Sequence, residues 1–97
     1  MSTELNSAKI RQLASQIGKI AENVSHVNSD TLRPVKNEIP DNFVGKAGTA
    51  LDESVTDLMA DVSSISGQLS SIQKALIALA IRLEQADQEA KALINSH

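Results

Sequence analysis

"LDESVTDLMADVSSISGQLSSIQKALIALAIRLEQADQEAKAL", Leu51 to Leu93, repeats apolar residues at alternating steps of four and three. This spacing places side chains on one face of an α-helix at every turn. The alternation holds over thirteen positions, which are Leu51, Val55, Leu58, Val62, Ile65, Leu69, Ile72, Leu76, Leu79, Leu83, Ala86, Ala90 and Leu93. The stretch therefore predicts one long amphipathic helix over about residues 48–95.

A shorter block with the same spacing comes earlier in the chain and predicts a first helix over about residues 3–33. Its members are Ile10, Leu13, Ile17, Ile20, Val24 and Val27. The repeat fails at Thr31 and Pro34, and a proline lacks the donor that a continuing helix needs. Two prolines and the turn-forming Asn and Asp of "RPVKNEIPDN" are typical of a connection. We expect an elbow over about residues 34–47.

Two helices joined by an elbow predict an all-α fold, an antiparallel hairpin formed by the single domain 1–97. With the turn centred near Ile39, residue i of the first helix faces about residue 78 − i of the second. The segment of the second helix after about Leu76 would then have an apolar face that no other part of the chain covers. A lone hairpin would expose that face, so we expect association into a four-helix bundle. The residues expected at this interface are Leu69, Ile72, Leu76, Ile77, Leu79, Ile81 and Leu83.

Composition and charge exclude several classes of binding partner. The net charge is −3 and the nine basic residues are scattered singly, which offers no footprint for nucleic acid or an anionic membrane. The longest apolar run, "ALIALAI" at 75–81, is far short of the ~20 residues of a spanning helix. The first residues lack the basic and apolar regions of a signal peptide. We expect no contact with nucleic acid and no membrane span.

The sequence contains few candidate catalytic residues. The imidazoles are His26 and His97, cysteine is absent, and no glycine-rich loop is followed by the Lys-Ser/Thr of a phosphate-binding loop. These residues form neither a nucleophile paired with its base nor a set of metal ligands. We expect a protein that is not an enzyme and that holds no cofactor and no metal.

The elbow carries a more specific pattern. Phe43, Gly45 and Ala47 form an aromatic-x-Gly-x-Ala element between the two helices, and Phe43 is the only aromatic residue of the chain. Glycine lets the backbone turn tightly, and the aromatic ring is suited to cover the open end of a helical bundle. In a chain of 97 residues, this element resembles that of the WXG-type family of small hairpin proteins exported by type VII (ESX) secretion. The aromatic residue of that family is normally Trp.

The end of the second helix shows a second similarity to this family. The family's export pattern is a hydrophobic residue, an acidic residue four positions on, a small residue three further on and a hydrophobic residue four beyond it. Leu83, Asp87, Ala90 and Ile94 have this spacing, with Leu at the position that is often aromatic. The same spacing also continues the apolar seam, so both interpretations of these four residues stay open.

The resemblance implies a non-enzymatic protein, made in the cytoplasm of a Gram-positive bacterium and secreted without a cleaved signal peptide. Its partners would be itself, as a homodimer, or a related small helical protein, together with the type VII machinery. A second implied role is a chaperone-like partner that binds the helical N-terminal region of a larger toxin. Two alternatives lie outside the family: an amphipathic protein that acts on membranes through 77–83, and a coiled-coil adaptor unrelated to secretion.

Overall fold

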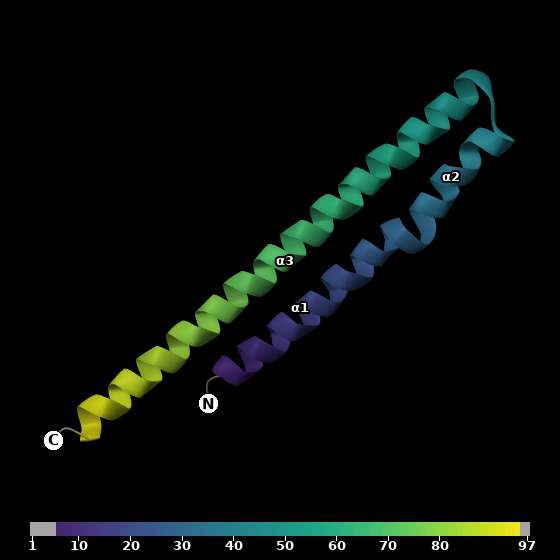
Figure 1. Cartoon of the computed structure of the whole chain (residues 1–97). Coiled ribbons are helices and arrows are strands. Elements are labelled where there is room, and N and C mark those ends of the chain that lie inside the picture. Colours follow the sequence, from purple (N-terminus) through teal and green to yellow (C-terminus); the bar gives the residue numbers. More distant parts are fainter. Residues whose placement is uncertain (1–5, 96–97) are drawn as a thin grey trace, which may run out of the picture.

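The computed structural model describes residues 6–95, which form two helical arms lying side by side (Figure 1). The first arm contains α1 (Ser7–Val27), the π-helix η1 (Asn28–Leu32) and α2 (Arg33–Asn42), and the second is the single helix α3 (Gly45–Asn95). The arms run antiparallel in a rod of 79 × 20 × 18 Å. The predicted all-α hairpin is confirmed.

The first helix starts at an asparagine cap. The Oδ1 atom of Asn6 accepts a hydrogen bond of 2.9 Å from the backbone N–H of Lys9, which satisfies one of the donors left free in a first turn. α1 therefore begins at Ser7, whereas the sequence predicted a start near residue 3. Residues 3–5 lie outside the described part of the chain.

The connection between the arms is much shorter than expected. Between α2 and α3, only Phe43 and Val44 lie outside helices, although the sequence predicted an elbow over 34–47. Pro34 is tolerated because it occupies one of the first positions of α2, where a helix needs no backbone donor. Pro40 lies inside α2, close to its end.

The π-helix explains why the apolar repeat fails at Thr31 and Pro34. A π turn holds one residue more than an α turn. Steps of seven run from Ile10 to Ile17 and Val24, and this series continues at Leu32, eight residues on. The extra residue thus restores the phase of the helix, and Ile39 is buried at 4% exposure. Figure 1 shows the first arm bending between α1 and α2.

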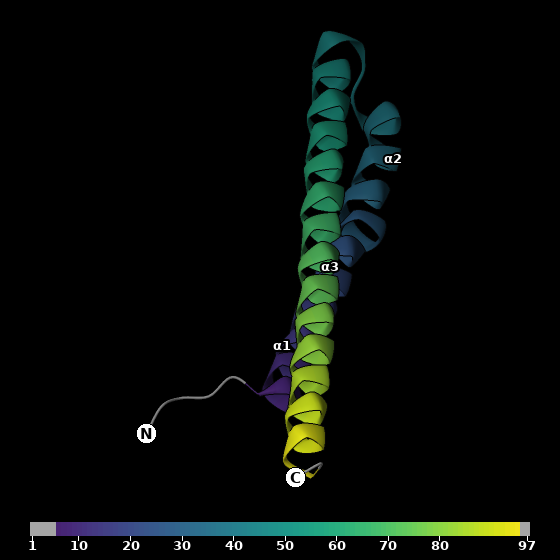
Figure 2. The same ribbon diagram turned by 90° about the vertical axis from the view of Figure 1, so that its left-hand side faces the viewer.

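The two arms pack along a line that we call the hairpin seam. Its most buried members are Ile10, Ala14, Ala21 and Ile39 on the first arm, and Gly48, Val55, Val62 and Ala80 on α3. Half of these residues are Ala or Gly, so the two backbones can come close together at those positions. In Figure 2, α2 lies on one side of α3 and α1 emerges on the other, so the first arm crosses α3 at a shallow angle.

The pairing of the arms differs from the expected sum of 78. Arg11 bonds to Glu84, a side chain built on Gly18 would meet Gln73, and Asn28 bonds to Ser63, so facing residues sum to about 91. The physical reason is the short connection, which moves the turn from Ile39 to Phe43 and Val44. Ala80 is consequently buried, and the part of α3 that extends beyond the start of α1 is about half as long as expected (Figure 1).

Candidate association surface

Each arm has two flanks beside the hairpin seam. On α3 the seam passes through Val55, Met59 and Val62, and successive residues turn by about 100° around the axis. Leu58, just before Met59, therefore leans to one side, and Thr56, just after Val55, leans to the other. Because the arms run antiparallel, equivalent positions on the two arms lie on the same side of the hairpin.

One side, which we call the polar flank, is closed by contacts between the arms. Lys36 Nζ lies 3.1 Å from Asp52 Oδ1 and 2.7 Å from Thr56 Oγ1. Asn28 Nδ2 donates to the Met59 carbonyl at 2.9 Å and to Ser63 Oγ at 3.0 Å. A shallow groove along this flank is lined mainly by hydroxyl groups, those of Ser25, Ser29, Ser63, Ser66 and Ser70.

A bidentate ion pair lies at one end of the polar flank, near the start of α1. Arg11 Nε donates to Glu84 Oε2 at 2.9 Å, and Nη2 donates to Oε1 at 2.8 Å. The hydrogen bonds from Arg11 lower the pKa of Glu84, and the same contact raises the pKa of Arg11. Both side chains remain accessible to solvent, so the pair orients the arms more than it stabilises them.

The opposite side, which we call the apolar flank, exposes large aliphatic side chains. Its members recur every seven residues on each arm, and their exposed fractions lie between 38% and 48%. They are Leu13, Ile20 and Val27 on α1, and Leu51, Leu58, Ile65, Ile72 and Leu79 on α3. Half-exposed aliphatic side chains in two parallel rows form a contiguous apolar surface of the kind that marks an interface.

The structure divides the residues expected at the association interface. Ile72 and Leu79 belong to the apolar flank, while Leu69, Leu76 and Ile77 are half-buried between the arms. Ile81 and Leu83 are exposed at the level of the start of α1. The sequence prediction missed Leu13, Ile20, Val27, Leu51, Leu58 and Ile65, which were assigned to the seam. Their seven-residue spacing, each just before a position of the seam, is the signal that identifies them.

At the elbow, Gly45 and Gly48 have distinct roles. Gly45 has a φ of +74°, a conformation that glycine adopts without steric cost. A Cβ atom on Gly48 would lie 2.8 Å from the Phe43 carbonyl oxygen, so this glycine allows the chain to turn back onto α3. Ala47 is exposed, and Phe43 is 51% exposed at the tip of the hairpin. The phenyl ring is therefore accessible from outside the chain.

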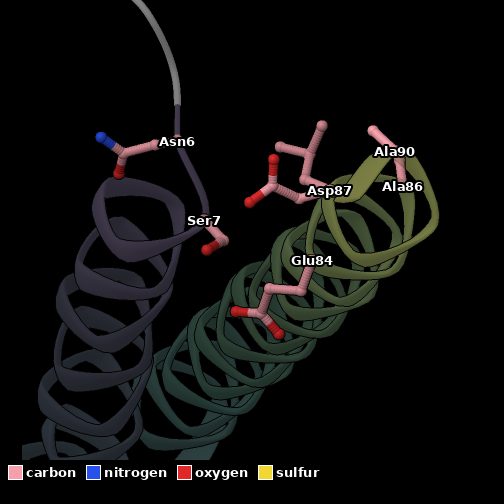
Figure 3. Close-up of a pocket in the computed structure, with 7 residues that line it drawn as sticks. Asn6, Ser7, Glu84, Ala86, Asp87 and Ala90 are labelled. Carbon is pink, nitrogen blue, oxygen red and sulfur yellow. The ribbon is translucent and has the colours of Figure 1, made fainter. Parts of the chain in front are cut away.

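Three of the four candidate export residues, Leu83, Asp87 and Ala90, line a shallow groove beside the start of α1, together with Asn6 and Ser7 (Figure 3). Figure 3 shows the carboxylate of Asp87 pointing toward α1. The fourth, Ile94, is 74% exposed on the part of α3 that has no facing arm.

Lys91 Nζ lies 3.8 Å from Asp87 Oδ2, one turn further along α3. Both side chains are largely exposed to solvent. This exposed pair adds little to stability and leaves the carboxylate accessible to other molecules.

Within residues 6–95, no three His, Asp or Glu side chains come close enough to hold a metal ion. His26 contacts only exposed carboxylates of its own arm, with Nδ1 3.4 Å from Asp30 Oδ2 and Nε2 4.0 Å from Glu22 Oε1. His97 lies outside the described residues. None of the helices in the described part of the chain combines the length and apolar character that crossing a membrane requires.

Comparison with known protein families identifies the hairpin. The WXG100 family, described as proteins of 100 residues with WXG, matches residues 2–88. This chain is a member of the WXG100 family. Phe43, Val44 and Gly45 of the elbow lie within the matched residues. No curated protein and no solved structure gave a significant match.

Membership confirms the resemblance drawn from the elbow and the tail. WXG100 proteins are small, non-enzymatic and associated with type VII secretion, which exports them without a cleaved signal peptide. Members typically form dimers. The apolar flank of this WXG100 protein carries eight half-exposed large aliphatic side chains.

Proposed function

We propose that this protein is a substrate of a type VII (ESX) secretion system that works by helix–helix association through its apolar flank. In this proposal it is made in the cytoplasm of a Gram-positive bacterium and leaves as a folded four-helix bundle. The observation that carries the proposal is the difference between the flanks. Contacts within the chain close the polar flank, whereas eight large aliphatic side chains remain half-exposed on the other.

The partner that fits the apolar flank is another small helical hairpin, a second copy or a related chain. Two antiparallel helices with a row of aliphatic residues on each match the same arrangement on a second hairpin. A larger toxin with a helical N-terminal region offers similar apolar rows, so the chaperone-like role uses the same surface. Both roles predict that a charge placed on this flank abolishes association.

The export signal in this proposal is the exposed end of α3. Asp87 and Ile94 are accessible, and Asp87 lies beside the start of α1, so a receptor could contact both arms at once. The elbow forms the other end of the molecule. There Phe43, Gly45 and Ala47 would close the end of the bundle, with the Phe43 ring as its cap.

The test is an export assay in two strains, one with the secretion machinery and one from which it has been deleted. We expect the wild-type protein in the culture medium of the first strain alone, without a cytoplasmic marker that would indicate lysis. Asp87→Ala should retain the protein in the cells. Glu89→Ala, an exposed charge two residues away and outside the pattern, is the matched control. Equal export by both strains would contradict the proposal.

A further inference from the structure

The helix α2 lies between two interruptions of the regular α-helical backbone. On one side, Phe43 and Val44 lie outside helices. On the other side, the backbone N–H of Arg33 donates to the carbonyl of Asn28, five residues back, which is the hydrogen bond of a π turn. Figure 1 shows the chain changing direction at both places. α2 is therefore a short segment with a joint at each end.

The sequence of α2 gives this helix little stability of its own. It has ten residues, and isolated helices shorter than ~12–15 residues are at best marginally stable in water. Pro40 has no backbone N–H to donate to the Lys36 carbonyl, and Asn37, Asp41 and Asn42 are weak helix formers. α2 therefore depends on its contacts with α3 to remain helical.

Few side chains hold α2 against α3. Ile39 is 4% exposed and is the one buried residue among residues 33–42, whereas Val35 is 43% exposed. Lys36 contacts Asp52 and Thr56, but both members of the ion pair with Asp52 are partly exposed, so this pair contributes little to stability. By contrast, α1 buries three residues in the hairpin seam, which are Ile10, Ala14 and Ala21. α2 is thus held less firmly than α1.

The end of α1 is fixed independently of α2. Asn28 Nδ2 donates to the Met59 carbonyl and to Ser63 Oγ, which ties the first residue of η1 to α3. The next three residues, 29–31, are exposed. The backbone can therefore change direction after Asn28 without disturbing the packing of α1.

We propose that α2 is a releasable strap, a segment that detaches from α3 while α1 stays packed. The two joints absorb the change in backbone direction, and the contacts of Ile39 and Lys36 are the ones that break. The inference concerns a motion within the hairpin and does not depend on export or on association.

Release of the strap changes the elbow end of the molecule. It uncovers Gly48 and Val55 on α3, which lie one turn from Leu51 of the apolar flank, so the accessible apolar surface grows at that end. It also moves Phe43, whose backbone N–H donates to the Ile39 carbonyl at 2.9 Å. The strap thus regulates how much apolar surface the elbow end offers to a partner.

Hydrogen exchange of backbone amides tests the strap with a matched pair of variants, Ile10→Val and Ile39→Val. The two isoleucines are 2% and 4% exposed, and each change removes one buried methylene group. Exchange is followed by NMR under conditions in which the rate reports the opening equilibrium. In the wild-type protein, amides 37–39 should exchange at least about tenfold faster than amides 14–24, because they open with the strap.

The two variants separate release of the strap from unfolding of the whole hairpin. Ile10 stays packed when the strap is released, so Ile10→Val should accelerate amides 14–24 about fivefold and leave amides 37–39 unchanged. Ile39 loses its contacts in both events, so Ile39→Val should accelerate both groups about fivefold. If Ile10→Val accelerates amides 37–39 as much as amides 14–24, α2 opens only with the whole hairpin and the inference is wrong.

Cysteine labelling tests the uncovered surface, because the chain has no cysteine of its own. Val55 lies between the two residues that Lys36 contacts, and Val62 lies between the two that Asn28 contacts. The first is therefore covered by α2 and the second by the fixed end of α1. Val55→Cys should react with a maleimide about tenfold faster than Val62→Cys in the native protein, and equally fast in denaturant. Equal rates in the native protein would overturn the inference.

Discussion

The polar and apolar flanks of this hairpin come from the same two helices and have opposite organisation. On the polar flank, Asn28 reaches Ser63, Lys36 reaches Asp52 and Arg11 reaches Glu84, so the arms satisfy one another. On the apolar flank, the aliphatic side chains remain half-exposed. The hairpin thus makes side-chain contacts between its arms on one side and exposes aliphatic side chains on the other.

The comparison shows that many large aliphatic side chains lie on the apolar flank and that several small ones lie between the arms. Ala14, Ala21 and Ala80 are buried there, and the backbone carbonyl of Ala21 accepts a hydrogen bond of 2.9 Å from Ser66 Oγ. Small residues allow the backbones to approach, and the neighbouring Leu13 and Ile20 are displaced to the flank. Part of the apolar area that stabilises the fold is consequently buried only on association.

The largest expected effect comes from a charge placed on the apolar flank. Leu58→Glu would bury an unpaired carboxylate twice per dimer, and we expect the association constant to fall roughly a thousandfold. Light scattering over a dilution series measures this change. The control is Ser25→Glu, which adds the same charge to the polar flank and should leave the dimer intact. An equal loss with both variants would show that the flanks do not differ in this way.

Truncation of one residue in the seam and one on the flank separates folding from association. Ile10 is 2% exposed, and Ile10→Ala should lower the free energy of unfolding by about 3 kcal/mol through the cavity that it leaves. Ile20 is 47% exposed, so Ile20→Ala should weaken the dimer but have a smaller effect on the fold of the hairpin. Chemical denaturation at two protein concentrations distinguishes the two effects. A larger loss with Ile20→Ala at both concentrations would contradict this assignment.

A smaller effect is expected at Asn28, a half-buried residue that hydrogen-bonds across the polar flank. Asn28→Ala removes hydrogen bonds to the Met59 carbonyl and to Ser63, but it also removes a buried Oδ1 atom that has no partner. The opposing contributions predict a loss of about 1 kcal/mol in the free energy of unfolding. Ser64→Ala, a hydroxyl on the outer face of α3, serves as the control in the same denaturation experiment. A stabilised Asn28→Ala would mean that the orphaned oxygen dominates.

The smallest effect belongs to the ion pair of the polar flank. The pKa of Glu84 is lowered in the folded chain, so its contribution to stability is present above the pKa of an unfolded carboxylate and is lost as the pH falls through the folded value. Glu84→Gln should remove this part of the acid dependence. Thermal melts at pH 7 and pH 3 measure it, and salt should reduce the difference. Parallel losses in the two proteins would assign the acid dependence to other carboxylates.

The apolar repeat was sufficient to predict two helices, the long α3 and the antiparallel hairpin. It was not sufficient to assign the inward face, because the repeat was interpreted as a single seam. Leu51, Leu58 and Ile65 interleave with Val55 and Val62 at steps of three and four, so one helical stripe could contain them all. Burial is decided instead by the close approach of the arms over small residues.

The preference of proline for turns also gave a wrong length for the connection between the arms. Pro34 and Pro40 predicted a long elbow, but α2 accommodates both in the structure. The pairing of the arms depends on the true turn at Phe43 and Val44, so the predicted free tail was too long. The aromatic-x-Gly element could be recognised from the sequence because its residues are adjacent in the chain, and its role in this protein stays a prediction. The role of Gly48 depends on its approach to the Phe43 carbonyl, which only the structure displays.

The π turn at Asn28–Leu32 indicates how this helix tolerates a change in its own length. Seven-residue steps from Val24 would reach residue 31, yet Leu32 is the residue that turns inward, so the first arm contains one residue more than an unbroken repeat requires. Deletion of Thr31 would convert the π turn to an α turn and keep Leu32 and Ile39 on the same inward face. A single-residue insertion in an ancestral helix would thus remain recorded as a local bulge, with the elbow and the pairing of the arms preserved.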